Sequence, residues 1–155
     1  MTDLLVPLYD LEKAEVPEGF WVGRPLPHQA PVVIRFVEDT FGEAWAAETE
    51  TAFSSVPPTV TVAVEEKTGN VVGFCCWDCT ARGFLGPVGV ERRFRKQGVG
   101  EALVLDALRR MREAGYGYAV IGGVGPVSFF SSVCDAREIE GSDPGIYGNP
   151  IAEDR

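Results

Sequence analysis

A run of six residues, Arg95 to Gly100, places two glycines and a basic pair directly before a sequence typical of a helix. The first N–H groups of a helix have no partner within it, and the helix dipole adds about half a positive charge there. Gly98 and Gly100 leave these N–H groups accessible because they carry no side chain, and Arg95 and Lys96 add positive charge. The run therefore predicts a turn that binds phosphate oxygens.

Two common phosphate-binding motifs do not match this run. It lacks the Gly-Lys-Ser/Thr of a P-loop and the third glycine of a Rossmann fingerprint. The preceding residues also predict antiparallel strands, whereas both motifs follow a strand of a parallel sheet. The alternative is a structural protein in which these glycines only form a tight turn and bind nothing.

The elements around the run predict an α/β fold with a mixed, mostly antiparallel sheet. Strands are expected at 19–24, 59–66, 71–79, 81–90 and 116–124, with one or two short strands in the tail, and helices at 27–41, 42–53, 100–115 and 126–136. The alternation in 59–66 and the turn residues after it predict a hairpin. Gly86-Pro87 predicts a bulge or a sheet edge, because proline cannot donate to a ladder. The strand-helix-strand order that follows predicts a parallel crossover.

Length and charge limit the class of protein. A chain of 155 residues predicts one domain, residues 1–155. The net charge of −9 argues against a nucleic-acid partner and favours a cationic substrate, although solubility explains it equally well. No apolar stretch reaches the roughly 20 residues that span a bilayer, and the first residues lack the basic start of a secretory signal. We therefore expect a cytoplasmic protein without a membrane partner; the oligomeric state stays open, with a homodimer as one option.

The four cysteines include a Cys-x-x-Cys pair, Cys76 and Cys79. A structural zinc site needs four ligands, usually supplied by two close pairs. Only Cys134 and His28 could complete such a set, and neither belongs to a close pair. Residues 76 and 79 are also expected to face opposite sides of a strand. We predict small buried cysteines, with no metal and no disulfide.

The run from Arg95 to Gly100 matches Arg/Gln-x-x-Gly-x-Gly/Ala in full, and the chain here resembles the GNAT acyltransferases, which use acetyl-coenzyme A. The order of elements over residues 20–148 is similar as well. The resemblance implies that Gly98, Val99 and Gly100 bind the pyrophosphate, and that Val88 to Val90 pair with the pantetheine arm like an added strand. The complete set of cofactor-binding residues that it implies is Val88, Gly89, Val90, Arg95, Lys96, Gln97, Gly98, Val99 and Gly100.

The resemblance further implies an N-acetyltransferase in which a small primary amine attacks the thioester directly. Family members commonly use a tyrosine of the last helix as the acid that protonates the departing thiolate. In "GVGPVSFF" this position is occupied by Phe130, which has no proton to donate. The catalytic residues therefore stay unassigned. The candidates are Cys134, Tyr118 and Ser131 for the acid, and Asp78, Glu65 and Glu66 for the base.

Two aromatic residues of the first helices, Phe41 and Trp45, are expected to line the acceptor side of the site. The departure at Phe130 favours an alternative from another class of protein. In that alternative the chain is a non-catalytic coenzyme A-binding sensor or a partner-binding module.

Overall fold

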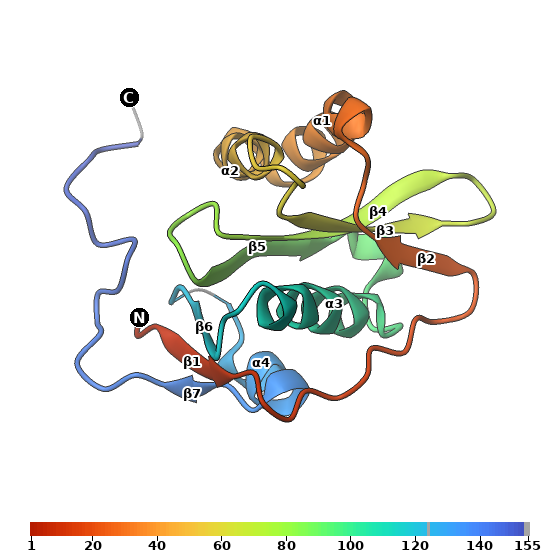
Figure 1. Cartoon of the computed structure of the whole chain (residues 1–155). Helices are drawn as coiled ribbons and strands as arrows, with labels where there is room; N and C mark the ends of the chain where they lie inside the picture. The colour runs from red at the N-terminus through yellow and green to blue at the C-terminus, as the bar shows by residue number, and fades with distance from the viewer. Residues whose placement is uncertain (124, 154–155) are drawn as a thin grey trace.

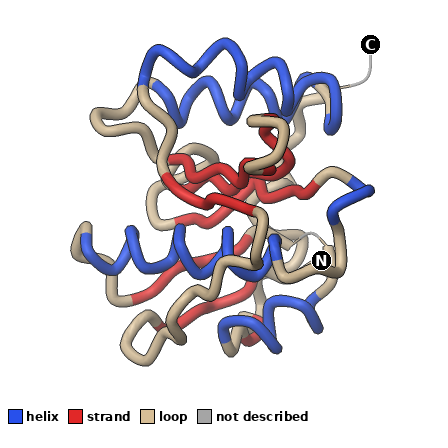
Figure 2. Tube along the Cα trace, turned by 90° about the vertical axis from the view of Figure 1, so that its right-hand side faces the viewer, coloured by secondary structure: helices blue, strands red, loops and turns tan. Residues whose placement is uncertain are grey.

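The computed structural model describes residues 1–123 and 125–153. The strands are β1 (Leu4–Pro7), β2 (Phe20–Gly23), β3 (Val60–Glu65), β4 (Asn70–Trp77), β5 (Phe84–Val90), β6 (Tyr118–Ile121) and β7 (Arg137–Glu138). The helices are α1 (Ala30–Phe41), α2 (Glu43–Phe53), α3 (Val99–Glu113) and α4 (Val127–Cys134), with short 3-10 turns at Pro27–Gln29 and Arg92–Phe94. Helices α1 and α2 cover one face of the central strands, α3 covers the other, and α4 packs against α3 and β1 (Figures 1 and 2).

All seven strands form one sheet in the order β2-β3-β4-β5-β6-β1-β7. Within the described residues only β5 and β6 pair in parallel, through the crossover helix α3, and the other neighbours are antiparallel. The predicted mixed sheet and its crossover are thereby confirmed. The expected strand at 116–124 is shorter in the structure, and its residue Val124 lies outside the described residues.

One strand was not expected from the sequence. The first strand, β1, lies between β6 and β7, and it pairs with both in antiparallel register. Its residues Leu4 and Val6 are buried, whereas Leu5 is exposed. The segment before β2 thus belongs to the sheet beside the crossover strand, more than 100 residues away in sequence.

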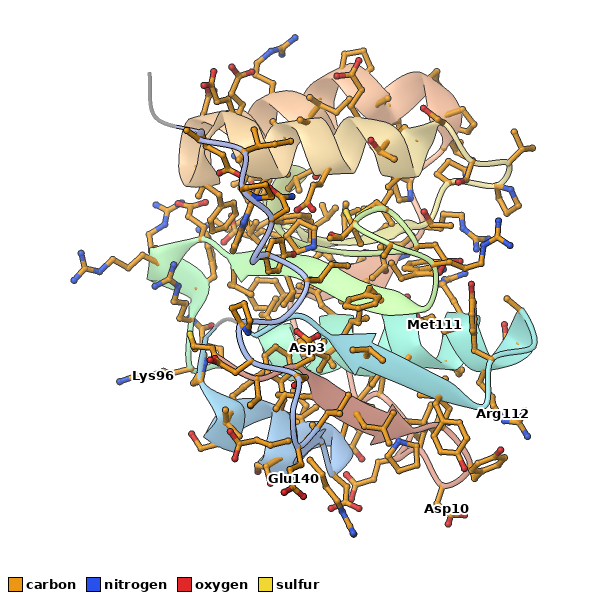
Figure 3. The ribbon with its side chains drawn as sticks, turned by 90° about the vertical axis from the view of Figure 1, so that its left-hand side faces the viewer. Asp3, Asp10, Lys96, Met111, Arg112 and Glu140 are labelled. Atoms are coloured by element: carbon orange, nitrogen blue, oxygen red, sulfur yellow. The ribbon has the colours of Figure 1, made fainter. Side chains whose placement is uncertain are left out.

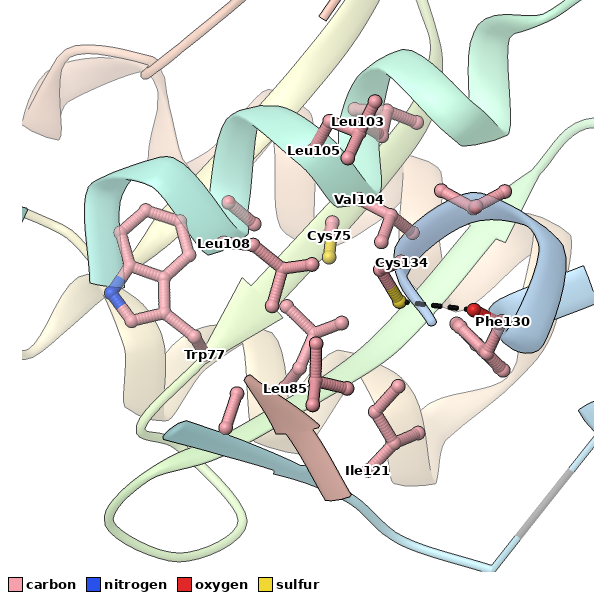
Figure 4. Packing of buried hydrophobic residues seen from close by; sticks show 14 of the residues in the cluster. Cys75, Trp77, Leu85, Leu103, Val104, Leu105, Leu108, Ile121, Phe130 and Cys134 are labelled. Carbon is pink, nitrogen blue, oxygen red and sulfur yellow. Dashed lines mark hydrogen bonds between the residues drawn. The ribbon is translucent and has the colours of Figure 1, made fainter. Parts of the chain in front are cut away.

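The core consists of two apolar clusters on opposite faces of the sheet. Alternate residues of β4 belong to the two clusters. Cys75 and Trp77 face α3, while Phe74 and Cys76 face α1 and α2. Figure 4 shows the larger cluster, in which side chains of α3 interlock with those of α4, β5 and β6. This packing fixes the start of α3 relative to the end of β5.

The cysteine pair is arranged differently from the prediction. Strand β4 ends at Trp77, and Asp78 turns the chain with a left-handed φ of 57°. The alternation therefore stops before Cys79, which packs against the same cluster as Cys76. The expectation that these two cysteines face opposite sides is wrong. All four cysteines are free thiols.

The described residues contain neither a membrane-spanning helix nor a cluster of metal ligands. Within 1–123 and 125–153, no helix has the length and apolar character to cross a membrane. In the same ranges, no three His, Cys, Asp or Glu side chains gather closely enough to hold a metal ion.

Candidate functional site

The parallel strands β5 and β6 pair over only the first part of β5, because β6 ends at Ile121 while β5 continues to Val90. They pair at Phe84–Val120 and Leu85–Ile121, and the ladder ends there. Directly beyond, the register between β4 and β5 shifts at Gly86-Pro87, where two residues of β5 oppose one of β4. The bulge that the sequence predicted at this dipeptide is confirmed, and it begins where the pairing of β5 with β6 ends.

The edge of β5 beyond the bulge offers free backbone groups. The Glu91 amide donates to the Val72 carbonyl at 2.8 Å, and hydrogen-bonded pairs alternate along an antiparallel ladder. By this alternation Gly89 bonds to β4, whereas Val88 and Val90 turn their backbone groups toward the gap. Among the described residues no strand pairs with that edge. Three residues were expected to pair with a pantetheine arm. The backbone groups of one of them, Gly89, are therefore already hydrogen-bonded to β4.

The glycine turn has the backbone geometry that an anion needs. Lys96 and Gly98 both adopt left-handed conformations, with φ of 62° and 88°, and α3 begins at Val99 without a side-chain cap. The first intrahelical bond runs from the Ala102 amide to the Gly98 carbonyl, so the amides of the preceding turn are left for a ligand. Gly100 borders Phe129 and Val90, which a Cβ at this glycine would approach to 3.6 Å.

Positive side chains surround this turn, but Arg95 is partly engaged. Its Nε donates to the Val90 carbonyl at 2.9 Å, which ties the turn to the free edge of β5. The exposed side chain of Lys96 projects into solvent beside it (Figure 3). Gln97 donates to the Arg93 carbonyl at 3.4 Å. Glu101, in the first turn of α3, is the nearest acidic residue in sequence on the helix side.

Phe130, which the resemblance places at the position of the family's acid, is buried. Its side chain is 5% exposed and lies in the larger core cluster, so a tyrosine there would place its hydroxyl among apolar side chains. Cys134 is also buried, and its thiol donates to the Phe130 carbonyl at 3.2 Å (Figure 4). Burial raises the pKa of Cys134 to about 11. Both residues belong to the larger core cluster.

The remaining candidate acids lie at different places. Ser131 is exposed on α4. Tyr118 begins β6, on the far side of the Phe84–Val120 pair from the gap, and its ring packs edge-on against Tyr9 with centroids 5.6 Å apart. The gap between β5 and β6 is therefore out of reach for Tyr118.

The candidate bases have structural partners. Asp78 accepts the Gly83 amide at 2.6 Å and the Tyr116 hydroxyl at 2.9 Å from each of its oxygens, which shapes the β4–β5 loop. Burial raises the pKa of the Tyr116 phenol, and its hydrogen bond to Asp78 raises that pKa further. Glu65 accepts the Thr68 hydroxyl at 2.8 Å in the β3–β4 hairpin, and Glu66 follows it there. That hairpin lies at the opposite end of β4 from Asp78.

The two aromatic residues expected on the acceptor side belong to one stack. The ring of Phe41 lies 5.3 Å from that of Trp45 and 5.4 Å from that of Phe74. It also covers Gly89, where a Cβ would come within 2.6 Å of the Phe41 ring. The absence of a side chain at Gly89 thus lets α1 pack against β5 on the face opposite α3.

Three polar residues that the sequence analysis did not select meet at the bulge. Thr80 donates to Glu48 of α2 at 2.5 Å, and its hydroxyl lies 3.5 Å from that of Tyr147 in the tail. The Tyr147 ring lies against Gly122, directly after β6. No local pattern relates these residues, because they are separated by 32 and 67 positions.

The chain matches the family described as "Acetyltransferase (GNAT) family" over residues 30–126. That range contains strands β5 and β6 and the glycine turn. No curated protein matches the chain with significance.

Solved structures of similar fold include several acetyltransferases. A GCN5-related N-acetyltransferase from Sphaerobacter thermophilus superposes with a TM-score of 0.72 at 21% identity, over 89% of this chain and 48% of its own. A glucosamine N-acetyltransferase region of a fungal multi-domain β-N-acetylglucosaminidase gives 0.71 at 18% identity, over 89% and 19%. A GNAT acetyltransferase from Brucella melitensis in complex with acetyl-CoA gives 0.58 at 20% identity, over 73% and 80%. The chain thus spans about half or less of the first two.

Proposed function

The chain belongs to the GNAT acetyltransferase family, and on that premise we propose that it is an N-acetyltransferase acting on a small primary amine. Enzymes of this family use acetyl-CoA as the acyl donor. When bound, acetyl-CoA would supply a thioester whose carbonyl carbon bonds to the nitrogen of the neutral amine as the carbon–sulfur bond breaks. The nitrogen would lose one proton to solvent, and the departing thiolate would take up a proton.

The observation that carries the proposal is the juxtaposition of two backbone features. The free edge of β5 at Val88 and Val90 leads directly to the left-handed turn at Gly98 and the uncapped start of α3. We assign the pantetheine arm to that edge and the pyrophosphate to the amides of Val99 and Gly100. The arm can use both backbone groups of Val88, while the Val90 carbonyl already accepts from Arg95.

We leave the acid unassigned, since a thiolate is a good leaving group and solvent can protonate it. The absence of a tyrosine at position 130 had favoured a coenzyme A-binding module. Because Phe130 is buried in the core, its lack of a proton does not by itself decide between an enzyme and such a module. We also propose that residues 1–155 form one acyltransferase domain, because strands from both ends of the chain share one sheet. A cytoplasmic location and a homodimer stay predictions.

Calorimetric titration with coenzyme A, together with thiol release from acetyl-CoA in the presence of a panel of primary amines, tests the proposal. We expect binding and amine-dependent thiol release. Binding without transfer to any amine would favour the coenzyme A-binding module. Neither binding nor transfer would favour a glycine turn that is only structural.

A further inference from the structure

A carboxylate lies at the bulge of β5 without a cationic partner. Glu48 is partly buried, and one of its oxygens accepts the Thr80 hydroxyl at 2.5 Å. Within residues 1–123 and 125–153, no lysine or arginine forms an ion pair with Glu48. A carboxylate accepts several hydrogen bonds, so the Thr80 bond leaves capacity for a charged donor.

The position of this carboxylate is tied to the bulge through the β4–β5 loop. Cys79, the neighbour of Thr80, donates its thiol to the Gly86 carbonyl at 3.2 Å. Glu48 also lies three residues after Trp45 on α2, so both side chains are on the same side of that helix. The carboxylate is therefore close to the bulge on the β5 side, next to the aromatic stack of α1 and α2.

The C-terminal tail lies on the side of the Glu48 carboxylate that is next to β6. Residues after β7 run across the edge of the molecule from β1 toward α2 (Figures 1 and 3). The Asp3 amide donates to the Ser142 hydroxyl at 2.8 Å, and the Met1 amino group pairs with Asp143. The tail then places the Tyr147 ring on Gly122, where a Cβ would come within 2.5 Å of the ring. Its hydroxyl, 3.5 Å from that of Thr80, bridges the β6 side to the β5 side.

This end of the gap is where a bound acetyl group would lie. Under the assignment above, the pyrophosphate is at Gly98 to Gly100 and the arm runs back along β5 from Val90. The strand from Val90 to Gly86 spans about 13 Å at the usual rise per residue, the scale of an extended pantetheine arm. The thioester would then be near the bulge, within the ring of residues formed by Glu48, Thr80 and Tyr147.

We propose that Glu48 binds the protonated amino group of the acceptor, which loses a proton to solvent before the neutral amine attacks. The Tyr147 ring of the tail forms the side of this site next to β6. This inference rests on the proposed function and adds the charge of the substrate and the residue that recognises it. A charge-assisted hydrogen bond to the carboxylate selects a cation over a neutral isostere of the same size. The apolar faces of Trp45 and Tyr147 suit an amine on an apolar or aromatic arm.

The test measures amine binding to the coenzyme A complex, in which no transfer can occur. Phenethylamine, putrescine and the neutral analogue 2-phenylethanol are titrated calorimetrically into wild type, Glu48→Gln and Glu50→Gln. Glu50 is exposed on the same helix, so its variant removes an equal charge outside the site. We expect at least one amine to bind, the alcohol not to bind, and only Glu48→Gln to weaken the amine, by about 10- to 100-fold. The variant should melt like wild type, since glutamine can still accept from Thr80.

A second pair of variants tests the wall. Tyr147→Ala should weaken the same amine, whereas Tyr118→Ala, which removes a tyrosine exposed to a similar degree at the other end of β6, should not. Equal effects of Glu48→Gln and Glu50→Gln, or no binding by either amine, would overturn the inference. If coenzyme A binds and amines are acetylated while Glu48→Gln behaves as wild type, only this inference fails. If coenzyme A itself does not bind, the proposed function fails first.

Discussion

Replacing Gly98 with alanine tests the phosphate-binding turn. Gly98 has a φ of 88°, and an added Cβ would lie 3.3 Å from Pro17. A residue with a Cβ costs about 1–2 kcal/mol in the left-handed region. For a chain of this size, 1 kcal/mol lowers Tm by about 2–4 °C, so Gly98→Ala should melt roughly 2–8 °C below wild type.

Gly115→Ala is the matched control for this strain. Gly115 has a φ of 111° after the end of α3, and no atom lies within 4 Å of an added Cβ. Its variant should lose a similar amount of stability without touching the turn. The two variants therefore separate the cost of a left-handed alanine from the loss of a ligand site.

The assay is thermal unfolding with and without coenzyme A. At 100 times its dissociation constant, a ligand adds about 2.7 kcal/mol, or roughly 5–11 °C for this chain. Gly115→Ala should keep the full shift. Gly98→Ala should lose about 1.4 kcal/mol or more of it, which corresponds to a tenfold weaker affinity. A full coenzyme A shift in Gly98→Ala would refute the assignment of the pyrophosphate to this turn.

Three other substitutions or modifications give direct outcomes. Phe130→Tyr should lower the free energy of unfolding in urea by about 1–3 kcal/mol, because its hydroxyl would be buried without a partner; unchanged stability would mean that the position is open to the cleft. Arg95→Ala should lower the free energy of unfolding by about 0.5–1.5 kcal/mol, because the hydrogen bond to the Val90 carbonyl is lost. The coenzyme A affinity of this variant, measured by calorimetry, should fall more at low salt than at high salt. Cys79 should be the first thiol to react with a disulfide reagent near neutral pH, since its neighbour Cys76 lowers the pKa of Cys79 while that thiol is only partly buried. Cys76→Ala should raise that pKa and slow the reaction, as followed by mass spectrometry; an equal rate would contradict the influence of Cys76.

The predictions that the structure confirms depended on local patterns. The hairpin of β3 and β4, the helix α3 and the bulge at Gly86-Pro87 each follow from residues close together in sequence. Alternation, apolar spacing and the missing amide of proline act within one element. The glycine turn was found for the same reason: its geometry depends on six adjacent residues.

The features that the sequence did not predict depend on distant contacts. Strand β1 has only four residues, and its partner Ile121 is 117 positions from Leu4. The burial of residue 130 depends on how α4 packs against α3, which no local pattern shows. The error at Cys79 came from extending an alternation past Trp77, where the left-handed Asp78 ends it.

The tail gives a final prediction, which concerns Gly145. This residue has a φ of 79°, and an added Cβ would come within 2.6 Å of Asp3 Oδ1. That oxygen cannot move away freely, because it accepts the Gly123 amide at 3.1 Å. Gly145→Ala should therefore detach the tail. Gly141 has a φ of 81° and no atom within 4 Å of an added Cβ, so Gly141→Ala introduces backbone strain without a steric clash.

Hydrogen exchange of the tail and amine binding measure this difference. In Gly145→Ala we expect faster exchange after β7, weaker amine binding and an unchanged coenzyme A affinity, because the glycine turn lies on the other end of β5. Gly141→Ala should keep its amine affinity. If the tail of Gly145→Ala exchanges faster but the amine binds as before, Tyr147 does not wall the acceptor site. If exchange is unchanged in both variants, the contact between Gly145 and Asp3 does not hold the tail in place.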